Sequence, residues 1–179
     1  VNALYELSHQ MLQMRDLSKP QQGLKMNWTV ANAGTNRNVI PADAVAFADV
    51  RVWSVADYDG IEAEVRARAK KQLLPEAKVE VDFVRRRPPL EPTDVAKALA
   101  KRAETIYREI GRELTVSSIA EGGGTDAAFA SLKAKGPVIE RFGFAGFGAH
   151  SNDAEYIAIS SIEPRLYLLA RMVMEVSAR

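Results

Sequence analysis

The first half of the chain switches between a helical and a strand-like pattern of apolar residues. Between Val1 and Leu17 apolar side chains recur three or four positions apart, which predicts an amphipathic helix with no capping residue ahead of it. Residues 24–30 and 79–83 show the two-residue period of half-buried strands. Residues 44–53 are rich in Val, Ala and Phe, which predicts another strand, antiparallel to the one at 24–30. Residues 57–73 place an apolar side chain at every fourth position, which predicts a second helix.

The order helix, strand, strand, helix, strand predicts an α+β domain over residues 1–90. It matches a split β-α-β-β-α-β, or ferredoxin-like, unit that lacks its first strand. That strand is central in such a sheet. Its absence, and a chain that opens inside a helical pattern without Met, predict a piece of a longer protein. The crossing that follows contains Pro88, Pro89 and Pro92 and is expected to be ordered.

The second half, residues 91–179, alternates predicted helices and strands. Helices are expected from Thr93 to near Gly111, over 125–133, and from Ser160 to the end, where Ser160-Ser-Ile-Glu163 has the pattern of a capping box. Short strands are expected over 114–119 and near Val138. This alternation predicts an α/β layer that is incomplete by itself. The buried face expected for the last helix consists of Ile162, Leu166, Leu169, Met172, Val173 and Val176.

Composition narrows the chemistry. The formal net charge of the 179 residues is +1, so nothing favours nucleic acid or an anionic membrane as a partner. No apolar run approaches the roughly 18–20 residues that span a bilayer. The absence of Cys excludes disulfides and cysteine-ligated zinc, and the two His make a self-contained multi-histidine metal site improbable. A signal sequence would lie upstream, so cytoplasm and periplasm both stay open.

Three contiguous glycines, 122–124, precede Thr125 and Asp126 between a predicted strand and a predicted helix. Glycine lets the backbone approach a ligand closely, and free N–H groups at a helix start attract anions. The alternative is a tight turn capped by Thr125 or Asp126, and the residues alone leave both open. No Gly-Lys-Ser/Thr follows and the glycines are not spaced, so P-loop and dinucleotide-binding sites are disfavoured.

Two further positions could carry chemistry. His150 ends a glycine-rich loop with carboxylates close behind it, and neutral imidazole is a common zinc ligand. A lone loop histidine is nevertheless more often an ordinary surface residue. Arg51 lies inside an apolar strand and needs a partner there; a guanidinium suits a carboxylate held by two hydrogen bonds, or simply pairs with a neighbouring Asp. His9 lies within the first predicted helix and receives no role.

Five short segments, taken in order, resemble the M20 family of metallopeptidases. They are VNAL at 1–4, NVIPA at 38–42, ADVR at 48–51, GGGTDA at 122–127 and GFGAHS at 146–151. The resemblance covers essentially the whole chain, and the glutamate carboxypeptidases are the nearest members. It implies a catalytic α/β domain that binds two zinc ions, and an inserted ferredoxin-like lid domain that forms a homodimer.

Residues 1–90 would then be the lid, and residues 91–179 the C-terminal part of the catalytic domain. The resemblance implies that His150 is a metal ligand and that Arg51 holds the terminal carboxylate of the substrate. The full set of substrate-binding positions that it implies is Asn38, Arg51, Arg87, Gly123, Gly124 and Thr125. We expect the dimer to form through the first helix and the strand around Met26–Val30, whose sequence lacks the Pro or Lys that would protect an edge.

The other zinc ligands, and the Glu that takes a proton from zinc-bound water in this family, would lie upstream of Val1. We therefore expect the chain alone to be inactive and not to retain zinc. The expected activity of the parent protein is hydrolysis of the amide of a C-terminal glutamate, in small peptides, N-acyl amino acids or folate-like substrates. The alternatives are an aminoacylase, dipeptidase or desuccinylase parent, or a non-catalytic dimerisation module.

Overall fold

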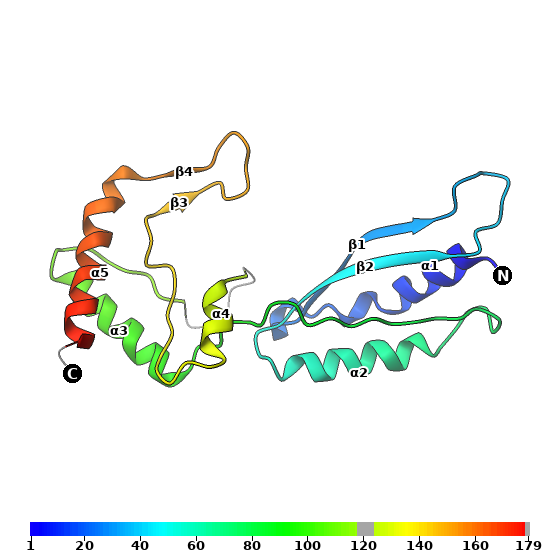
Figure 1. Cartoon of the computed structure of the whole chain (residues 1–179), viewed down its shortest axis with the longest axis horizontal. Coiled ribbons are helices and arrows are strands. Elements are labelled where there is room, and N and C mark those ends of the chain that lie inside the picture. The colour runs from blue at the N-terminus through cyan, green and yellow to red at the C-terminus, as the bar shows by residue number, and fades with distance from the viewer. Residues whose placement is uncertain (118–123, 178–179) are drawn as a thin grey trace. The chain divides into compact units, whose positions relative to one another are not determined.

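The computed structural model describes residues 1–117 and 124–177, which form two compact units (Figure 1). The first consists of residues 1–91 and 124–128, and the second of residues 92–117 and 129–177. The first unit contains α1 (Ala3–Gln13), β1 (Lys25–Ala33), β2 (Ala44–Arg51) and α2 (Asp57–Ala69). The second contains α3 (Asp94–Arg108), β3 (Gly146–Phe147), β4 (Tyr156–Ile157) and α5 (Ile162–Ser177), and α4 (Asp126–Ser131) begins in the first unit and ends in the second.

Strands β1 and β2 form an antiparallel ladder, as predicted for residues 24–30 and 44–53. The register runs from Lys25 opposite Arg51 to Ala33 opposite Ala44, with a bulge between Trp28 and Val30. Side chains of β2 alternate between half-buried and exposed along its whole length. The α+β class predicted for this half of the chain is confirmed.

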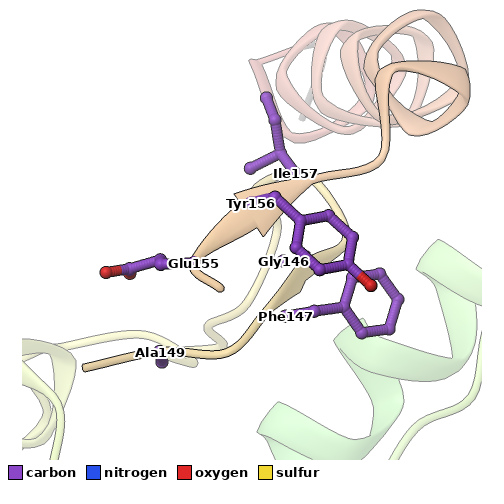
Figure 2. Close-up of a pocket in the computed structure, with 6 residues that line it drawn as sticks. All are labelled: Gly146, Phe147, Ala149, Glu155, Tyr156 and Ile157. Carbon is purple, nitrogen blue, oxygen red and sulfur yellow. The ribbon is translucent and has the colours of Figure 1, made fainter. Parts of the chain in front are cut away.

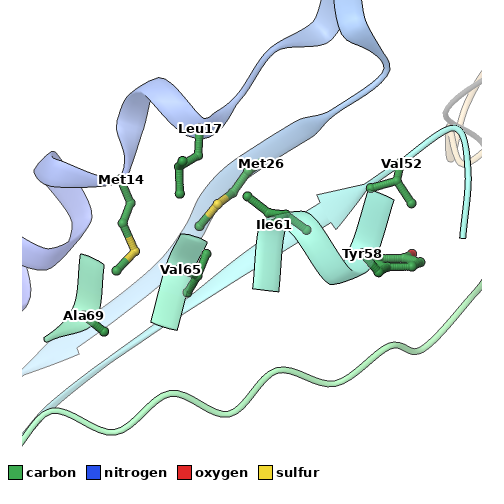
Figure 3. Close-up of a cluster of buried hydrophobic side chains, with 8 residues drawn as sticks. All are labelled: Met14, Leu17, Met26, Val52, Tyr58, Ile61, Val65 and Ala69. Carbon is green, nitrogen blue, oxygen red and sulfur yellow. The ribbon is translucent and has the colours of Figure 1, made fainter. Parts of the chain in front are cut away.

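Helices α1 and α2 cover one face of this ladder and enclose the core of the first unit (Figure 3). Ile61, Val65 and Ala69 form the buried face of α2, as their four-residue spacing predicted. Burying an aliphatic side chain of this size contributes roughly 1.5–3 kcal/mol. The remaining members of the core are Met14, Leu17, Met26, Val52 and Tyr58.

The expectation that the first helix lacks a cap is wrong. Asn2 is its N-cap, and the Asn2 side chain accepts a hydrogen bond from the Leu4 N–H at 3.1 Å. Asparagine is among the favoured residues at this position because its oxygen satisfies a helix N–H that has no partner within the helix. The helix is also shorter than predicted, because residues 15–17 form a separate 3-10 turn.

A buried carboxylate links α1 by hydrogen bonds to the turn that follows α2. Glu6 is 4% exposed and accepts hydrogen bonds from the backbone N–H groups of Leu73 and Leu74 at 3.0 and 2.8 Å. The Gln10 side chain donates a third, at 2.7 Å. Burial raises the pKa of the Glu6 carboxyl, but these three donors outweigh it and hold the pKa below its usual value. Glu6 is therefore ionised near neutral pH.

The third predicted strand does not form in the described residues. Residues 78–84 are extended and run alongside α2, and Val79, Val81 and Phe83 pack against the core (Figure 1). They alternate with exposed neighbours, as the sequence predicted, but they belong to no ladder. A strand needs a hydrogen-bonded neighbour, and in a ferredoxin-like sheet that neighbour would be the first strand, which is not present among the described residues.

In the second unit, α3 and α5 pack together around Ile106 and Leu168, which are fully buried. Thr93, where this helix was predicted to begin, is the N-cap of α3, and its hydroxyl accepts a hydrogen bond from the Ala96 N–H. Two ion pairs join the helices: Arg102 contacts Glu175 through Nε at 2.7 Å, and Arg171 contacts Glu109 at 3.1 Å. Arg171 and the Tyr167 hydroxyl lower the pKa of the Glu109 carboxyl, so that pair is charged at neutral pH.

Several expectations for the second half are wrong. Residues 114–117 and 138–139 form no strand, so the described residues contain no α/β sheet, only the short β3–β4 pair. The last helix begins at Ile162 after a 3-10 turn, and it buries Leu168 and Met172. Four of the residues predicted for its buried face are 46–59% exposed, namely Leu166, Leu169, Val173 and Val176. Within the described ranges, no helix combines the length and hydropathy needed to cross a membrane.

Candidate functional site

Arg51 closes β2 and projects from the exposed side of that strand. Its Nε contacts the Asp49 carboxylate at 2.7 Å, and both side chains are about half exposed. Residues two apart on a strand lie on the same face, so this pair could be predicted from the sequence. The alternative to a substrate role, an ion pair between Arg51 and a neighbouring Asp, is thus present. It does not exclude that role, because an exposed carboxylate can be exchanged for another at little cost.

Arg87 lies against the end of the glycine segment. A side chain at Gly124 would begin 2.5 Å from the Arg87 Cδ, so it would force the arginine side chain to move away. The Arg87 guanidinium is also 3.5 Å from the Asp126 carboxylate at the start of α4. The structure therefore brings together two predicted substrate-binding residues, Arg87 and Gly124, that are far apart in the sequence.

The contacts of Thr125 match the turn interpretation of the glycine segment. Its Oγ1 accepts a hydrogen bond from the Ala127 N–H at 3.2 Å, which is the contact of a helix N-cap. Gly123, also predicted to bind substrate, lies outside the described residues. A substrate role for Thr125 and Gly124 stays a prediction.

Asn38 lies at the far end of the β1–β2 ladder from Arg51. It belongs to the connection between the two strands, next to Pro41, whose carbonyl accepts the Ala3 N–H at the start of α1 (Figure 1). Strand β2 alone spans roughly 23 Å at about 3.3 Å per residue. One small substrate cannot contact Asn38 and Arg51 of the same copy.

Tyr58 is a residue of this region that sequence reasoning missed. Its hydroxyl donates a hydrogen bond to the Arg87 carbonyl oxygen at 3.0 Å. Burial, with the nearby Asp49 charge, raises the pKa of the Tyr58 hydroxyl, which is therefore protonated and able to donate. No pattern along the chain marks a contact between residues so far apart.

His150 lies beyond β3, in the turn of the β3–β4 hairpin. Its backbone is left-handed, with a φ of 69°, an uncommon conformation for a residue other than glycine. Gly148 is left-handed as well, and a side chain there would begin 2.1 Å from the Ala154 carbonyl oxygen. The Ser151 N–H donates to the Gly148 carbonyl oxygen at 2.8 Å, and the Ser151 hydroxyl accepts from the Ala154 N–H at 3.1 Å. The turn therefore has a specific, tight geometry.

The strands of this hairpin carry an exposed aromatic pair. Phe147 and Tyr156 stack with 5.2 Å between ring centroids (Figure 2). They belong to the lining of an open hollow of about 460 Å³, together with Gly146, Ala149, Glu155 and Ile157. The stacked pair fixes the two strands that lead into and out of the His150 turn.

The residues present do not make a zinc site on their own. Catalytic zinc takes about three protein ligands. Within residues 1–117 and 124–177, no group of three or more His, Cys, Asp or Glu side chains could hold a metal ion. His150 could supply one ligand, and the others would have to come from outside this set.

Comparisons with known proteins find sequence similarity along the chain. Residues 1–77 match the M20 profile described as a peptidase dimerisation domain. Carboxypeptidase G2 of Pseudomonas sp. (strain RS-16) is 43% identical over 178 residues, which is 99% of this chain. The chain spans 42% of the length of that relative.

Proposed function

We infer from these matches that this chain belongs to the M20 peptidase family, and we propose that the whole protein is a zinc-dependent carboxypeptidase. The proposed reaction is hydrolysis of the amide that joins a C-terminal glutamate to a small peptide, an N-acyl group or a folate-like group. The observation that carries the proposal is the 43% identity to a carboxypeptidase over 99% of the chain. The matched region spans both units, and so covers the segments that contain Arg51 and His150.

Each candidate residue has a separate proposed task. Arg51, on the exposed side of β2, would bind the terminal carboxylate of the substrate through its planar fork of N–H groups. Arg87, Gly124 and Thr125 would line the approach to the bond that is cleaved. His150 would be one of several zinc ligands, with the remainder outside this chain.

Asn38 would serve the site of a second copy. The ladder separates it from Arg51 by roughly 23 Å, more than a small substrate can bridge. A dimerisation domain supports formation of a homodimer. In such a dimer the connection between β1 and β2 of one copy can reach a site whose Arg51 belongs to the other.

The experiment that tests the function is a hydrolysis assay. The whole protein is expected to release glutamate from an N-acyl glutamate, to lose this activity on treatment with a chelator, and to regain it with zinc. The 179-residue chain alone is expected to stay inactive with added zinc, because its described residues cannot assemble a zinc site. Activity of the whole protein that survives complete removal of metal would contradict the proposal.

We propose that the homodimer forms through the outer face of α1 and the edge of β1. Leu12 and Val30, on these two elements, are 64% and 48% exposed. The double variant Leu12→Lys/Val30→Lys is expected to convert the dimer to monomer in light scattering, since it buries two charges without partners. Trp28 is unsuited to this test because its ring packs against the core.

Val84→Lys, at an equally exposed apolar position away from both elements, is the control and should stay dimeric. A Leu12→Lys/Val30→Lys protein that remains dimeric would place the interface elsewhere.

A further inference from the structure

One tyrosine of α2 contacts three alternate residues of the extended segment that ends at Arg87. Tyr58 is the second residue of that helix and is 7% exposed. Its ring meets Phe83 edge to face, with 6.4 Å between centroids, and the Arg85 guanidinium lies over the ring at 5.7 Å. Its hydroxyl hydrogen-bonds the Arg87 carbonyl oxygen. Tyr58 therefore contacts this segment through the side chains of Phe83 and Arg85 and through the backbone of Arg87.

The same segment has two further restraints. The Arg85 guanidinium contacts Asp59 at 2.7 Å and Glu62 at 2.9 Å, both on α2. After Arg87 the chain enters Pro88, and the residue before a proline is confined to extended backbone. The Arg87 backbone is thus held by the Tyr58 hydroxyl and confined by the proline ring that follows it.

By contrast, the contacts of the Arg87 side chain with charged groups are weak. Its ion pair with Asp126 is 3.5 Å long, and the Asp126 side chain is almost fully exposed. Pairs of this kind contribute little to the order of a side chain. The arginine side chain lies against Gly124, while the hydrogen bond from Tyr58 is made to its backbone.

We propose that Tyr58 is a positioning residue for Arg87, and that its hydroxyl holds the Arg87 backbone so that the guanidinium stays beside Gly124. The proposal rests on the proposed function, because it assigns Arg87 to the substrate side. Tyr58 itself need not touch the substrate. Tyr58 would influence the affinity for substrate indirectly, through its hydrogen bond to the backbone of Arg87.

Tyr58→Phe in the whole protein tests this, because it removes one oxygen and leaves the ring contacts with Phe83 and Arg85. KM for an N-acyl glutamate is expected to rise about three- to tenfold, the effect of one neutral hydrogen bond, with kcat little changed. Tyr107→Phe is the matched control. Tyr107 is also 7% exposed and lies under an arginine, Arg165, at 5.5 Å, but belongs to α3. The KM of the Tyr107→Phe variant is expected to stay at the wild-type value.

A double-mutant cycle separates positioning from general loss of stability. Arg87→Ala should raise KM, and adding Tyr58→Phe to it should raise KM no further, because the hydroxyl acts only through Arg87. If Tyr58→Phe raises KM by the same factor with and without Arg87, or does not raise it at all, the positioning role is overturned.

Hydrogen exchange gives a readout that does not need activity. In the protein without substrate, the backbone amides of residues 84–87 should exchange faster in Tyr58→Phe than in the wild type, and at the wild-type rate in Tyr107→Phe. Should Arg87→Ala leave KM unchanged, the substrate role of Arg87 would fail. The exchange rates would then still decide whether Tyr58 holds the segment, and unchanged rates in Tyr58→Phe would overturn that claim.

Discussion

His150→Ala in the whole protein is expected to lower kcat/KM by more than about a hundredfold and to reduce zinc content by about one ion per subunit. Loss of an outer-shell partner already costs roughly 10- to 100-fold, so loss of a direct ligand should cost more. The fold should survive, because His150 is exposed at the tip of a hairpin whose strands are fixed by the Phe147–Tyr156 stack. Turnover is measured with an N-acyl glutamate, and zinc by elemental analysis.

Two further variants make this test specific. His150→Asn removes the imidazole and keeps a residue that tolerates left-handed backbone, so any loss of zinc cannot be assigned to strain at a φ of 69°. His9→Ala is the matched control, because His9 is the second histidine and contacts the Lys71 carbonyl oxygen at 3.0 Å, in the first unit. His9→Ala should keep its zinc. Full zinc content with near-wild-type turnover in both His150 variants would rule out the ligand assignment.

Arg51→Ala is expected to lower kcat/KM about ten- to a hundredfold for substrates with a free terminal carboxylate. A hydrogen-bonded pair of opposite charges is worth roughly 1.5–3 kcal/mol, which corresponds to this range. The same substrates with an amide-capped terminus should already have a low kcat/KM in the wild type, and Arg51→Ala should lower it little further. Stability should barely change, since the Arg51–Asp49 pair is about half exposed.

Arg51→Lys refines the result. Lysine keeps the charge but not the planar fork of N–H groups, so Arg51→Lys should regain only part of the kcat/KM that Arg51→Ala loses. The assignment would be abandoned if Arg51→Ala affected free-acid and amide-capped substrates by the same factor. Asp49→Ala is a useful companion, because it leaves Arg51 in place and removes the carboxylate that contacts it in the structure.

Local pattern was sufficient for the elements of the first unit that pair or pack with near neighbours. Strands β1 and β2 pair with each other, and the buried face of α2 follows its own sequence period. The segment 78–84 shows the limit of such reasoning. Its alternating side chains reflect which of them meet the core, whereas a strand is defined by a hydrogen-bonded neighbour that the pattern does not describe.

Helix α5 shows a second limit. It carries apolar residues on two sides, and only the side with Leu168 and Met172 packs on α3. A single stripe of apolar residues predicts which face is buried, but two stripes leave the choice to the neighbouring elements. In the site, the Arg51–Asp49 pair could be foreseen from adjacent positions on one strand. The contact between Tyr58 and Arg87 could not, because it depends on how a helix and a distant segment meet.

The glycines before His150 differ in how much sequence variation they permit. At Gly143 a methyl group would meet nothing within 4 Å, and at Gly146 only the Tyr156 carbonyl oxygen at 3.9 Å. Gly148 combines left-handed backbone with a carbonyl 2.1 Å from where a side chain would begin. Among the described residues, positions 143 and 146 therefore have room for the Cβ of an alanine. Position 148 must stay glycine if the turn that presents His150 is to keep its shape.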